Sequence, residues 1–401
     1  MSVNYKKIIA DALLSLLCSM PLRKIKIKDI IEASGVSRQT FYNHFENRNA
    51  LFTWIYRTRI IADADPLDPP TDFYDNILSY YKNLYSYRSF IIAAAKLDET
   101  YSLRDIMEDF SLEWFAHYLE NFHSVPEVSH LEFAIRYNVH GFVGATLAWI
   151  LGGMEIAPER MAFYLYRSTP AILQAYLPAP MNALTRESLQ CGFANPQFYK
   201  FSFAKNSFNR ENRSVCDRFA MALVQMCEER PITSITVQDL LDKTKTGRQT
   251  FYSNFRDKNA LIQWTFRHHI LYLSPDGADF EECWVRYFRQ LEQYKHFISQ
   301  AGDLSGHNCL REYMRSCSEE WYRKQYYLNY GSDLIPLEIS YAIRFHAYGI
   351  VDSIIDWSKF RYSASPESIA KWVCACQPRQ MLIYPFIQRL NQEHNKNQFL
   401  A

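Results

Sequence analysis

Apolar residues recur at helical spacing through almost the whole chain, and proline or glycine residues separate the periodic stretches. Ile9, Leu13 and Leu16 are one example, because residues three or four apart lie on the same face of a helix. In the first half the pattern predicts helices at 4–19, 25–33, 37–44, 48–63, 72–93, 102–123, 131–152 and 158–177. The second half follows the same scheme, so we predict an all-α protein.

The sequence also matches itself. With a shift of 210, residues 21–60 match residues 231–270 at fifteen of forty positions. Further along the shift becomes 207 and then 208, and the matches stay in order: Glu113-Trp114 pairs with Glu320-Trp321, Gly141 with Gly349, and Pro158-Glu159 with Pro366-Glu367. Ordered matches over whole halves predict a tandem duplication.

Residues 25–44 have the features of a helix, a tight turn and a second helix. Ile27 and Ile30 give a short helix one apolar face, and Gly35 supplies a turn position where a positive φ is tolerated. Ser37 is a good N-cap for the next helix. Phe41 and Phe45, four residues apart, anchor that helix to the core.

The second of these helices leaves polar side chains on its outer face. Arginine and glutamine suit base edges, while hydroxyls and imidazoles suit the phosphate backbone; the outward residues are Arg38, Gln39, Thr40, Tyr42, Asn43 and His44. Asn47 can cap a further helix whose first turn carries Arg48, a place where a phosphate can bind. The alternative is an ordinary solvated surface, and the recurrence of the pattern at 248–252 favours nucleic acid.

Charge is distributed unevenly along the chain, although the net charge is only +1. Residues 1–60 carry +6 and residues 206–270 carry +3, whereas residues 61–180 carry −9. Residues 181–205 carry +2 and the remainder carries −1. Both helix-turn-helix segments therefore lie in basic parts of the chain, as contact with a polyanion requires.

The motif in the first half resembles the helix-turn-helix signature of the tetracycline-repressor (TetR) family. The resemblance rests on Ile27-x-Asp29-Ile30, Ala33-Ser34-Gly35-Val36-Ser37-x-x-Thr40-Phe41-Tyr42-x-His44-Phe45 and Leu51. It implies a recognition helix at 37–44 in the major groove, with phosphate contacts from Tyr42, His44 and Arg48 and with Lys28 near the start of the motif. It also implies dimers on palindromic operators, mostly repressors that a small molecule releases by binding the C-terminal helical domain.

The second copy keeps part of the signature. Lys245 stands where Gly35 does, so a residue other than glycine must adopt the turn conformation at a cost of roughly 1 kcal/mol. Asn254 replaces His44. From the two copies we predict two sets of DNA-binding residues: Lys28, Ser37, Arg38, Gln39, Thr40, Tyr42, Asn43, His44 and Arg48, and then Gln238, Gly247, Arg248, Gln249, Thr250, Tyr252, Ser253, Asn254 and Lys258. Because the copies differ at their flanks, we expect an imperfect palindrome with half-sites about one helical turn apart.

The helical region after each motif is rich in aromatic residues at helical spacing. A ligand pocket is the family's expectation for this region, and its candidates are Tyr81, Tyr85, Trp114, Tyr118, Trp149, Tyr287, Trp321 and Trp357. The alternative is that these residues form the hydrophobic core. No residue set identifies a small-molecule effector.

Small residues such as Gly141, Gly144 and Gly349 allow close approach of the later helices, which form the dimer interface in the family. Fusion of two halves then predicts an intramolecular pseudo-dimer. The alternative is a dimer of chains with four DNA-binding motifs.

These predictions divide the chain into six segments: a DNA-binding domain at 1–62, a helical regulatory domain at 63–178, a linker at 179–208, a second DNA-binding domain at 209–272, a second regulatory domain at 273–392 and a tail at 393–401. Each half is expected to be a TetR-like unit, with a three-helix bundle followed by a helical ligand and dimerisation domain. The partners are a double-stranded DNA operator and an unidentified small-molecule effector.

The nine cysteines are scattered and form no Cys-x-x-Cys pair, which favours reduced thiols, a cytoplasmic location and no metal site. We find no stretch that predicts a membrane span and no motif that predicts a cofactor or catalysis. The sequence therefore favours a transcription regulator, most simply a repressor. The alternative is a protein-interaction co-regulator whose second motif no longer binds DNA.

Overall fold

The computed structural model describes residues 4–61, 73–97, 102–122, 129–178, 197–200, 213–271, 280–304, 309–359, 361, 363–378 and 381. Helices dominate these residues, and a single two-stranded sheet is present among them, so the predicted all-α fold is confirmed. The chain forms two compact units. The first comprises residues 1–128, 142–169 and 173–194, and the second comprises residues 129–141, 170–172 and 195–401.

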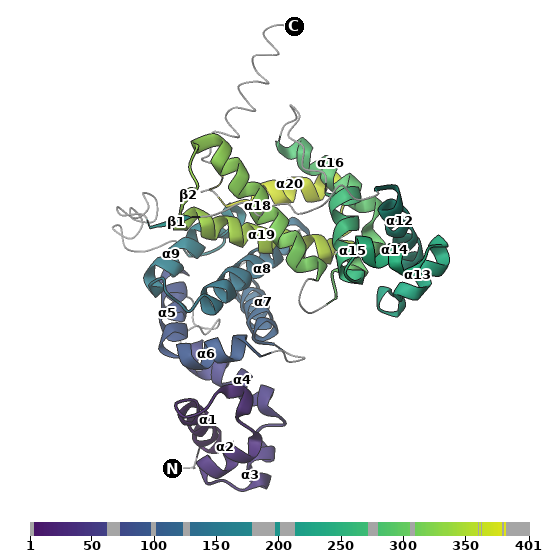
Figure 1. Cartoon of the computed structure of the whole chain (residues 1–401). Coiled ribbons are helices and arrows are strands. Elements are labelled where there is room, and N and C mark those ends of the chain that lie inside the picture. Colours follow the sequence, from purple (N-terminus) through teal and green to yellow (C-terminus); the bar gives the residue numbers. More distant parts are fainter. Residues whose placement is uncertain are drawn as a thin grey trace. The chain divides into compact units, whose positions relative to one another are not determined.

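The first unit starts with a small bundle and continues into longer helices (Figure 1). Its elements are α1 (Tyr5–Leu16), the 3-10 turn η1 (Leu22–Lys24), α2 (Ile27–Ser34), α3 (Arg38–His44), α4 (Arg48–Ile55), the π-helical turn η2 (Tyr56–Ile60), α5 (Phe73–Ser86), α6 (Arg88–Ala95), α7 (Leu103–Phe122), the later part of α8 (Ser129–Leu151) and α9 (Pro158–Ser168), with α10 (Ala171–Gln174) at the boundary.

Two helices predicted as continuous are interrupted. The predicted helix 72–93 is two helices, α5 and α6, because Tyr87 leaves helical geometry with φ −102° and ψ 22°. The predicted helix 158–177 ends at Ser168. Thr169 adopts a ψ of 129° there, as expected for a residue before proline, and Pro170 cannot donate to the helix.

The second unit repeats this order of elements after a short strand. Its elements are residues 129–141 of α8, β1 (Phe198–Lys200), α12 (Arg213–Glu229), η3 (Ile232–Ser234), α13 (Val237–Thr244), α14 (Arg248–Asn254), α15 (Lys258–Thr265), the π-helical turn η4 (Phe266–Ile270), α16 (Phe280–Gln293), α17 (Lys295–Ala301), α18 (Leu310–Tyr330), β2 (Leu334–Pro336), α19 (Leu337–Ser358) and α20 (Pro366–Cys376).

Part of the predicted linker is a strand. β1 pairs antiparallel with β2, and Tyr199 lies opposite Ile335, which is fully buried. The connecting segment therefore has regular structure at residues 198–200, while 179–196 and 201–208 lie outside the described residues. All the segment boundaries stay predictions.

Residues 129–141 of α8 pack closely on α19 inside the second unit. A Cβ built on Gly141 would lie 2.8 Å from both the ring and the carbonyl oxygen of Phe345, and one built on Gly349 would lie 2.9 Å from the carbonyl oxygen of Tyr137. The two backbones therefore approach at points where only glycine fits. Phe345 and Tyr137 are themselves completely buried.

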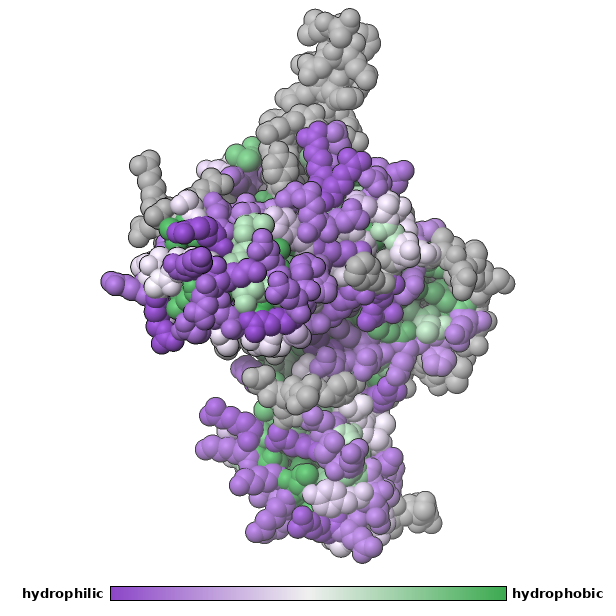
Figure 2. Space-filling view, turned by 90° about the vertical axis from the view of Figure 1, so that its right-hand side faces the viewer, coloured by the Kyte–Doolittle hydropathy of each residue, from purple (hydrophilic) through white to green (hydrophobic). Residues whose placement is uncertain are grey.

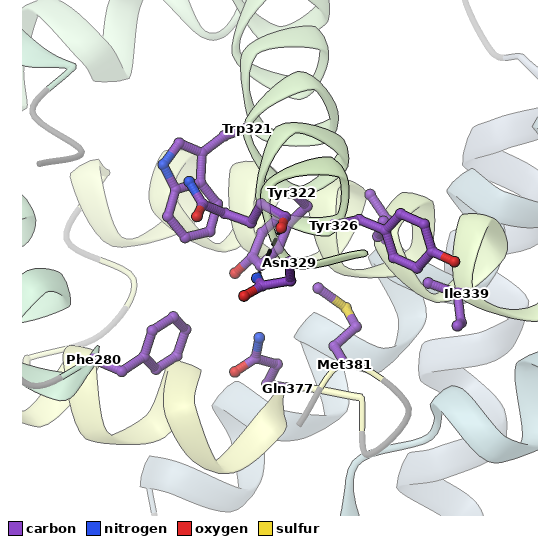
Figure 3. A pocket seen from close by; sticks show the side chains of 10 residues that line it. Phe280, Trp321, Tyr322, Tyr326, Asn329, Ile339, Gln377 and Met381 are labelled. Atoms are coloured by element: carbon purple, nitrogen blue, oxygen red, sulfur yellow. Dashed lines mark hydrogen bonds between the residues drawn. The ribbon is translucent and has the colours of Figure 1, made fainter. Parts of the chain in front are cut away.

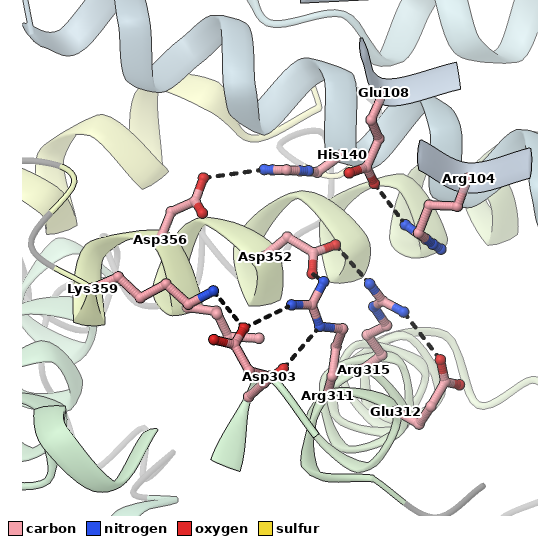
Figure 4. A network of polar contacts seen from close by, with 12 residues as sticks. Arg104, Glu108, His140, Asp303, Arg311, Glu312, Arg315, Asp352, Asp356 and Lys359 are labelled. Atoms are coloured by element: carbon pink, nitrogen blue, oxygen red, sulfur yellow. Dashed lines mark hydrogen bonds and ion pairs between the residues drawn. The ribbon is translucent and has the colours of Figure 1, made fainter. Parts of the chain in front are cut away.

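A buried ion network joins α18 to α19 (Figure 4). The Nη2 of Arg315 lies 2.6 Å from the Oδ2 of Asp352, and the side chains of both residues are less than 5% exposed. Arg311 contacts the other carboxylate oxygen of Asp352 at 3.0 Å, and Glu312 pairs with Arg315 at 3.1 Å. Removing one partner would leave an uncompensated buried charge, so the network fixes the register of the two helices.

Candidate nucleic-acid interface

The first head, α1 to α4, contains a well-formed helix-turn-helix. α2 ends at Gly35, which has a left-handed conformation with φ 67° and ψ 11°. Ser37 then caps α3, because its Oγ accepts a hydrogen bond of 3.0 Å from the backbone N–H of Thr40. Phe41 and Phe45 are buried and hold α3 against the core of the head. The predicted roles of all four residues are confirmed.

The opposite face of α3 is open to solvent. Arg38, Gln39, Tyr42 and Asn43 are exposed, while Thr40 and His44 are half-buried. The guanidinium of Arg38 lies over the ring of Tyr42 at 5.7 Å, and His44 stacks on Tyr5 of α1 at 5.8 Å. Lys28 and Ser37 are also exposed. Figure 2 shows the first head at the bottom of the view, where its outer end is largely hydrophilic.

The second head, α12 to α15, has the same turn with different residues. Lys245 adopts the left-handed conformation with φ 52° and ψ 45°, so the expectation that a residue other than glycine takes this position is confirmed. Gly247 offers no capping side chain to α14. The preceding helix, α13, does have a side-chain cap, because Thr236 and Asp239 form a reciprocal capping box at its start. Hydrogen bonds from Thr236 and the nearby Arg230 lower the pKa of Asp239 to about 2.

α14 presents the same exposure pattern as α3, position by position. Arg248, Gln249, Tyr252 and Ser253 are exposed, Thr250 and Asn254 are half-buried, and Phe251 is buried. Tyr252 is 53% exposed, compared with 44% for Tyr42. Both short helices therefore expose an arginine, a glutamine and a tyrosine to solvent. Side chains of these types can form hydrogen bonds with base edges and phosphates.

The flanks of α14 differ from those of α3. The Nδ2 of Asn254 donates to the carbonyl oxygen of Thr250 at 2.7 Å, and the Oγ of Ser253 donates to the same carbonyl at 3.0 Å. On α13, the Nε2 of Gln238 donates to the Oδ1 of Asp242 at 2.9 Å. These three side chains already hold bonds to their own helices.

Comparison with known families decides the class of this chain. A model described as bacterial regulatory proteins of the tetR family matches residues 9–54, which contain the first helix-turn-helix. A second model, described as a transcriptional regulator C-terminal region of the same family, matches residues 71–170. The chain belongs to the TetR family. Residues 9–170 thus carry both the DNA-binding region and the C-terminal region of a TetR-family transcription regulator.

Individual relatives are similar over shorter stretches. The activator DhaS, named an HTH-type dhaKLM operon transcriptional activator, from Lactococcus lactis subsp. lactis (strain IL1403), is 34% identical over 73 residues. That match spans 18% of this chain and 37% of the relative. A solved structure named dihydroxyacetone kinase operon activator DhaS covers 44% of this chain and 97% of its own, with 22% identity and a TM-score of 0.33.

Two cations of the predicted DNA-binding set form hydrogen bonds within their own heads. The Nη1 of Arg48 donates to the carbonyl oxygen of Ile25 at 3.1 Å, and the Nζ of Lys258 donates to those of Ile232 and Ile235 at 2.8 and 2.7 Å. Burial lowers the pKa of Lys258. Both cations thus tie the start of the fourth helix to the turn before the second one, and their predicted phosphate contacts stay predictions.

Four of the five predicted ligand residues in the first half are buried in its core. The hydroxyl of Tyr81 lies 2.5 Å from that of Thr146, and the Nε1 of Trp149 donates to the carbonyl oxygen of Ile156 at 3.0 Å. Trp114 and Tyr118 stack face to face at 5.0 Å. Tyr85 is exposed and lies under Arg88. A small cavity of about 10 Å³ in this unit is lined by other residues: Phe52, Phe90, Ala94, Leu97, Ser102, Leu103 and Ile106.

The second lobe places one predicted ligand residue at a cavity. Tyr287 and Trp357 are buried, and the Nε1 of Trp357 donates to the carbonyl oxygen of Ala364 at 3.1 Å. Trp321 lines a cavity whose enclosed part is about 30 Å³ and whose mouth is open to solvent. Of the eight predicted aromatic residues, Trp321 alone lines this cavity, and the assignment of ligand contacts stays a prediction. The prediction missed Gln377, a polar residue of this wall that no motif marks.

The described ranges contain neither a cluster of metal ligands nor a membrane-spanning helix. No group of three or more His, Cys, Asp or Glu side chains is placed to hold a metal ion there. Within the same ranges, no helix combines the length and apolar character that crossing a membrane requires.

Proposed function

We propose that this chain is a single-chain regulator whose two heads, through α3 and α14, bind the two halves of an imperfect palindromic operator. The matching exposure of Arg38, Gln39 and Tyr42 on α3 and of Arg248, Gln249 and Tyr252 on α14 carries the proposal. Both sets are solvent-facing in helices anchored by a buried phenylalanine. The output we propose is repression that a small-molecule effector relieves.

We propose further that the two halves pair as a pseudo-dimer. The contacts between α8 and α19 are reciprocal, because Gly141 meets Phe345 and Gly349 meets Tyr137. The shift of 208 residues makes Gly141 the counterpart of Gly349 and Tyr137 the counterpart of Phe345. Reciprocity of this kind is the signature of a two-fold interface, in which residue i meets j and j meets i. A monomer of 47.3 kDa in sedimentation supports the proposal, and a stable species of twice that mass as the sole form contradicts it.

Selection of bound fragments from random DNA gives the operator, its symmetry and its half-site spacing. Footprinting of Arg38→Ala and Arg248→Ala on that operator then tests the two heads separately. We expect each substitution to weaken protection of one half-site by about 1–3 kcal/mol. Loss of protection in Arg38→Ala but not in Arg248→Ala contradicts binding by the second head.

A second candidate function is a co-regulator in which the second head no longer binds DNA. Ser253 and Asn254 favour it, because both side chains are already bonded to the carbonyl of Thr250. Gly247 favours it as well, since α14 has no side-chain cap there. The same footprinting experiment distinguishes this function from the first.

The direction of regulation is part of the proposal. The Lactococcus lactis relative is named an activator, whereas repression is the commoner output that the family resemblance implies. A reporter placed behind the selected operator decides between them. Lower expression with the intact chain than without it supports repression, and higher expression contradicts it.

A further inference from the structure

The cavity of the second unit lies beside α18, where the N-terminal part of α19 and the residues after α20 meet it (Figure 3). Its enclosed part is about 30 Å³, and its mouth is open to solvent. Phe280, Trp321 and Tyr326 provide aromatic walls, and Ile339 and Met381 provide aliphatic ones. None of its ten lining residues is charged, so the cavity offers no counterion to a charged molecule.

Gln377 is the exceptional residue of this wall. It is only 4% exposed, and its Oε1 has no hydrogen-bond partner among the described residues. Figure 3 shows its carboxamide turned into the cavity, on the side of Phe280 and Asn329. A buried amide oxygen without a donor is unfavourable, and a bound molecule that donates a hydrogen bond would satisfy it.

The corresponding region of the first half explains the space. There Trp114 stacks on Tyr118, four residues later, with ring planes 4° apart. The shift of 207 residues makes Trp321 the counterpart of Trp114 and places Gln325, not an aromatic ring, at the position of Tyr118. The second half therefore lacks one phenol-sized ring beside the indole.

The same comparison separates Gln377 from its own counterpart. The shift of 208 residues places Thr169 at that position, and both residues follow a helix and precede a proline. The Oγ1 of Thr169 donates to the carbonyl oxygen of Leu165 at 3.3 Å. The hydroxyl is thus satisfied in the first half, whereas the amide oxygen is not in the second.

We propose that this cavity binds a small, uncharged aromatic compound whose ring lies against Trp321 and whose hydroxyl or N–H donates to the Oε1 of Gln377. The ring takes the place that Tyr118 fills in the first half. The proposal rests on the proposed function for its biological meaning, since it gives the effector a chemical class and a single site per chain.

A chain of hydrogen bonds connects the cavity wall to α8. The hydroxyl of Tyr322, a lining residue, lies 2.8 Å from the Nε2 of His346, and the Nδ1 of His346 is bonded to the hydroxyl of Tyr137 on α8. Burial lowers the pKa of His346 to about 3, so the imidazole is neutral. A neutral imidazole donates from one nitrogen and accepts at the other, so the two tyrosines take opposite roles. A ligand that moves Tyr322 therefore alters the bond to Tyr137, beside the close contact with Gly349.

The test uses the full chain and three probes of similar size: phenol, toluene and benzoate. Ligand-observed NMR titrations give their affinities for the natural chain, for Gln377→Leu and for the matched control Thr169→Val. We expect phenol to bind, benzoate not to bind and toluene to bind more weakly than phenol. Gln377→Leu should weaken phenol about tenfold and leave toluene unchanged, and Thr169→Val should alter neither. Equal phenol affinity in Gln377→Leu, or tight binding of benzoate, overturns the proposal.

Thermal unfolding provides a check that does not depend on a ligand. Gln377→Leu removes a buried oxygen that lacks a donor, so its melting temperature should equal or exceed that of the natural chain. A lower melting temperature shows that Gln377 has a partner inside the protein and overturns the proposed site.

DNA binding separates this proposal from the proposed function. We expect phenol to change the affinity for the selected operator, and Tyr137→Phe to abolish that change while phenol still binds. An unchanged phenol effect in Tyr137→Phe overturns the connection through His346. A chain that binds operator but no phenol refutes the cavity proposal alone, and a chain that binds phenol but no DNA refutes the proposed function alone.

Discussion

Exchanging the residues at the two helix-turn-helix turns would measure the strain in the second head. Gly35 and Lys245 occupy equivalent positions with similar left-handed conformations, φ 67° and 52°. Such a conformation costs a residue with a Cβ about 1–2 kcal/mol. Glycine loses more chain entropy on folding, which offsets about 0.5–1 kcal/mol of that cost.

We therefore expect Lys245→Gly to stabilise the second head by about 0.5–1 kcal/mol and Gly35→Lys to destabilise the first by a similar amount. A Cβ built on Gly35 meets no atom within 4 Å, so the penalty there comes from the backbone alone. Lys245 is exposed, which makes a lost packing contact unimportant.

Hydrogen exchange of the full chain, followed by mass spectrometry, is the assay. Exchange by local opening should slow about two- to fivefold over α13 and α14 in Lys245→Gly, and it should accelerate equally over α2 and α3 in Gly35→Lys. Lys245→Ala serves as the control, because it removes the charge and keeps the Cβ. Slower exchange in Lys245→Ala, or unchanged exchange in Lys245→Gly, refutes the reasoning from backbone strain.

Salt dependence, the contacts of Lys258 and the burial of His346 each give a further prediction. If the two heads together touch about six to ten phosphates, the logarithm of operator affinity should fall with the logarithm of salt concentration at a slope near −5 to −9. An affinity that does not change with salt concentration in fluorescence anisotropy contradicts this. Lys258→Met should destabilise the second head by about 2 kcal/mol, because the carbonyl of Ile235 loses the ammonium donor and that of Ile232 keeps only the backbone N–H of Ile235. Lys258→Arg, which copies Arg48, should not destabilise it, and equal hydrogen exchange over α15 in the two variants contradicts this role of Lys258. The free energy of unfolding of the second unit should fall by up to about 1.4 kcal/mol per pH unit between about pH 6.5 and pH 3, because His346 binds a proton in the unfolded chain and not when buried. His346→Asn, which copies Asn138 of the first half, should flatten this dependence in denaturant titrations. An unchanged slope in that variant contradicts the prediction.

The heads were predictable because their signals are local. Gly35 and Ser37 determine the turn and the cap within a few residues, and Phe41 fixes which face of α3 is buried. The same spacing recurs in the second head, so the exposed residues of α14 followed from those of α3. Even the conformation of Lys245 could be inferred, since the turn leaves that position no alternative.

Features that depend on distant segments were not predictable. The guanidinium of Arg48 bonds to a carbonyl 23 residues earlier, and nothing in the local sequence distinguishes that role from phosphate binding. β1 forms because residues 334–336 lie beside it, and its three residues are too few to predict a strand partner from the sequence. Gln377 is marked only by the lack of a partner, which is a property of packing and not of sequence.

The glycine contacts between α8 and α19 affect how promoter occupancy depends on the number of protein copies. Two separate polypeptides that pair through such a surface dissociate on dilution. The concentration of the paired form, and with it the occupancy of the target, then falls with the square of the total concentration. Here Gly141 and Gly349 belong to the same polypeptide, and dilution cannot separate them. Under the proposed pairing, promoter occupancy rises in simple proportion to copy number when copies are scarce, without the threshold that assembly imposes.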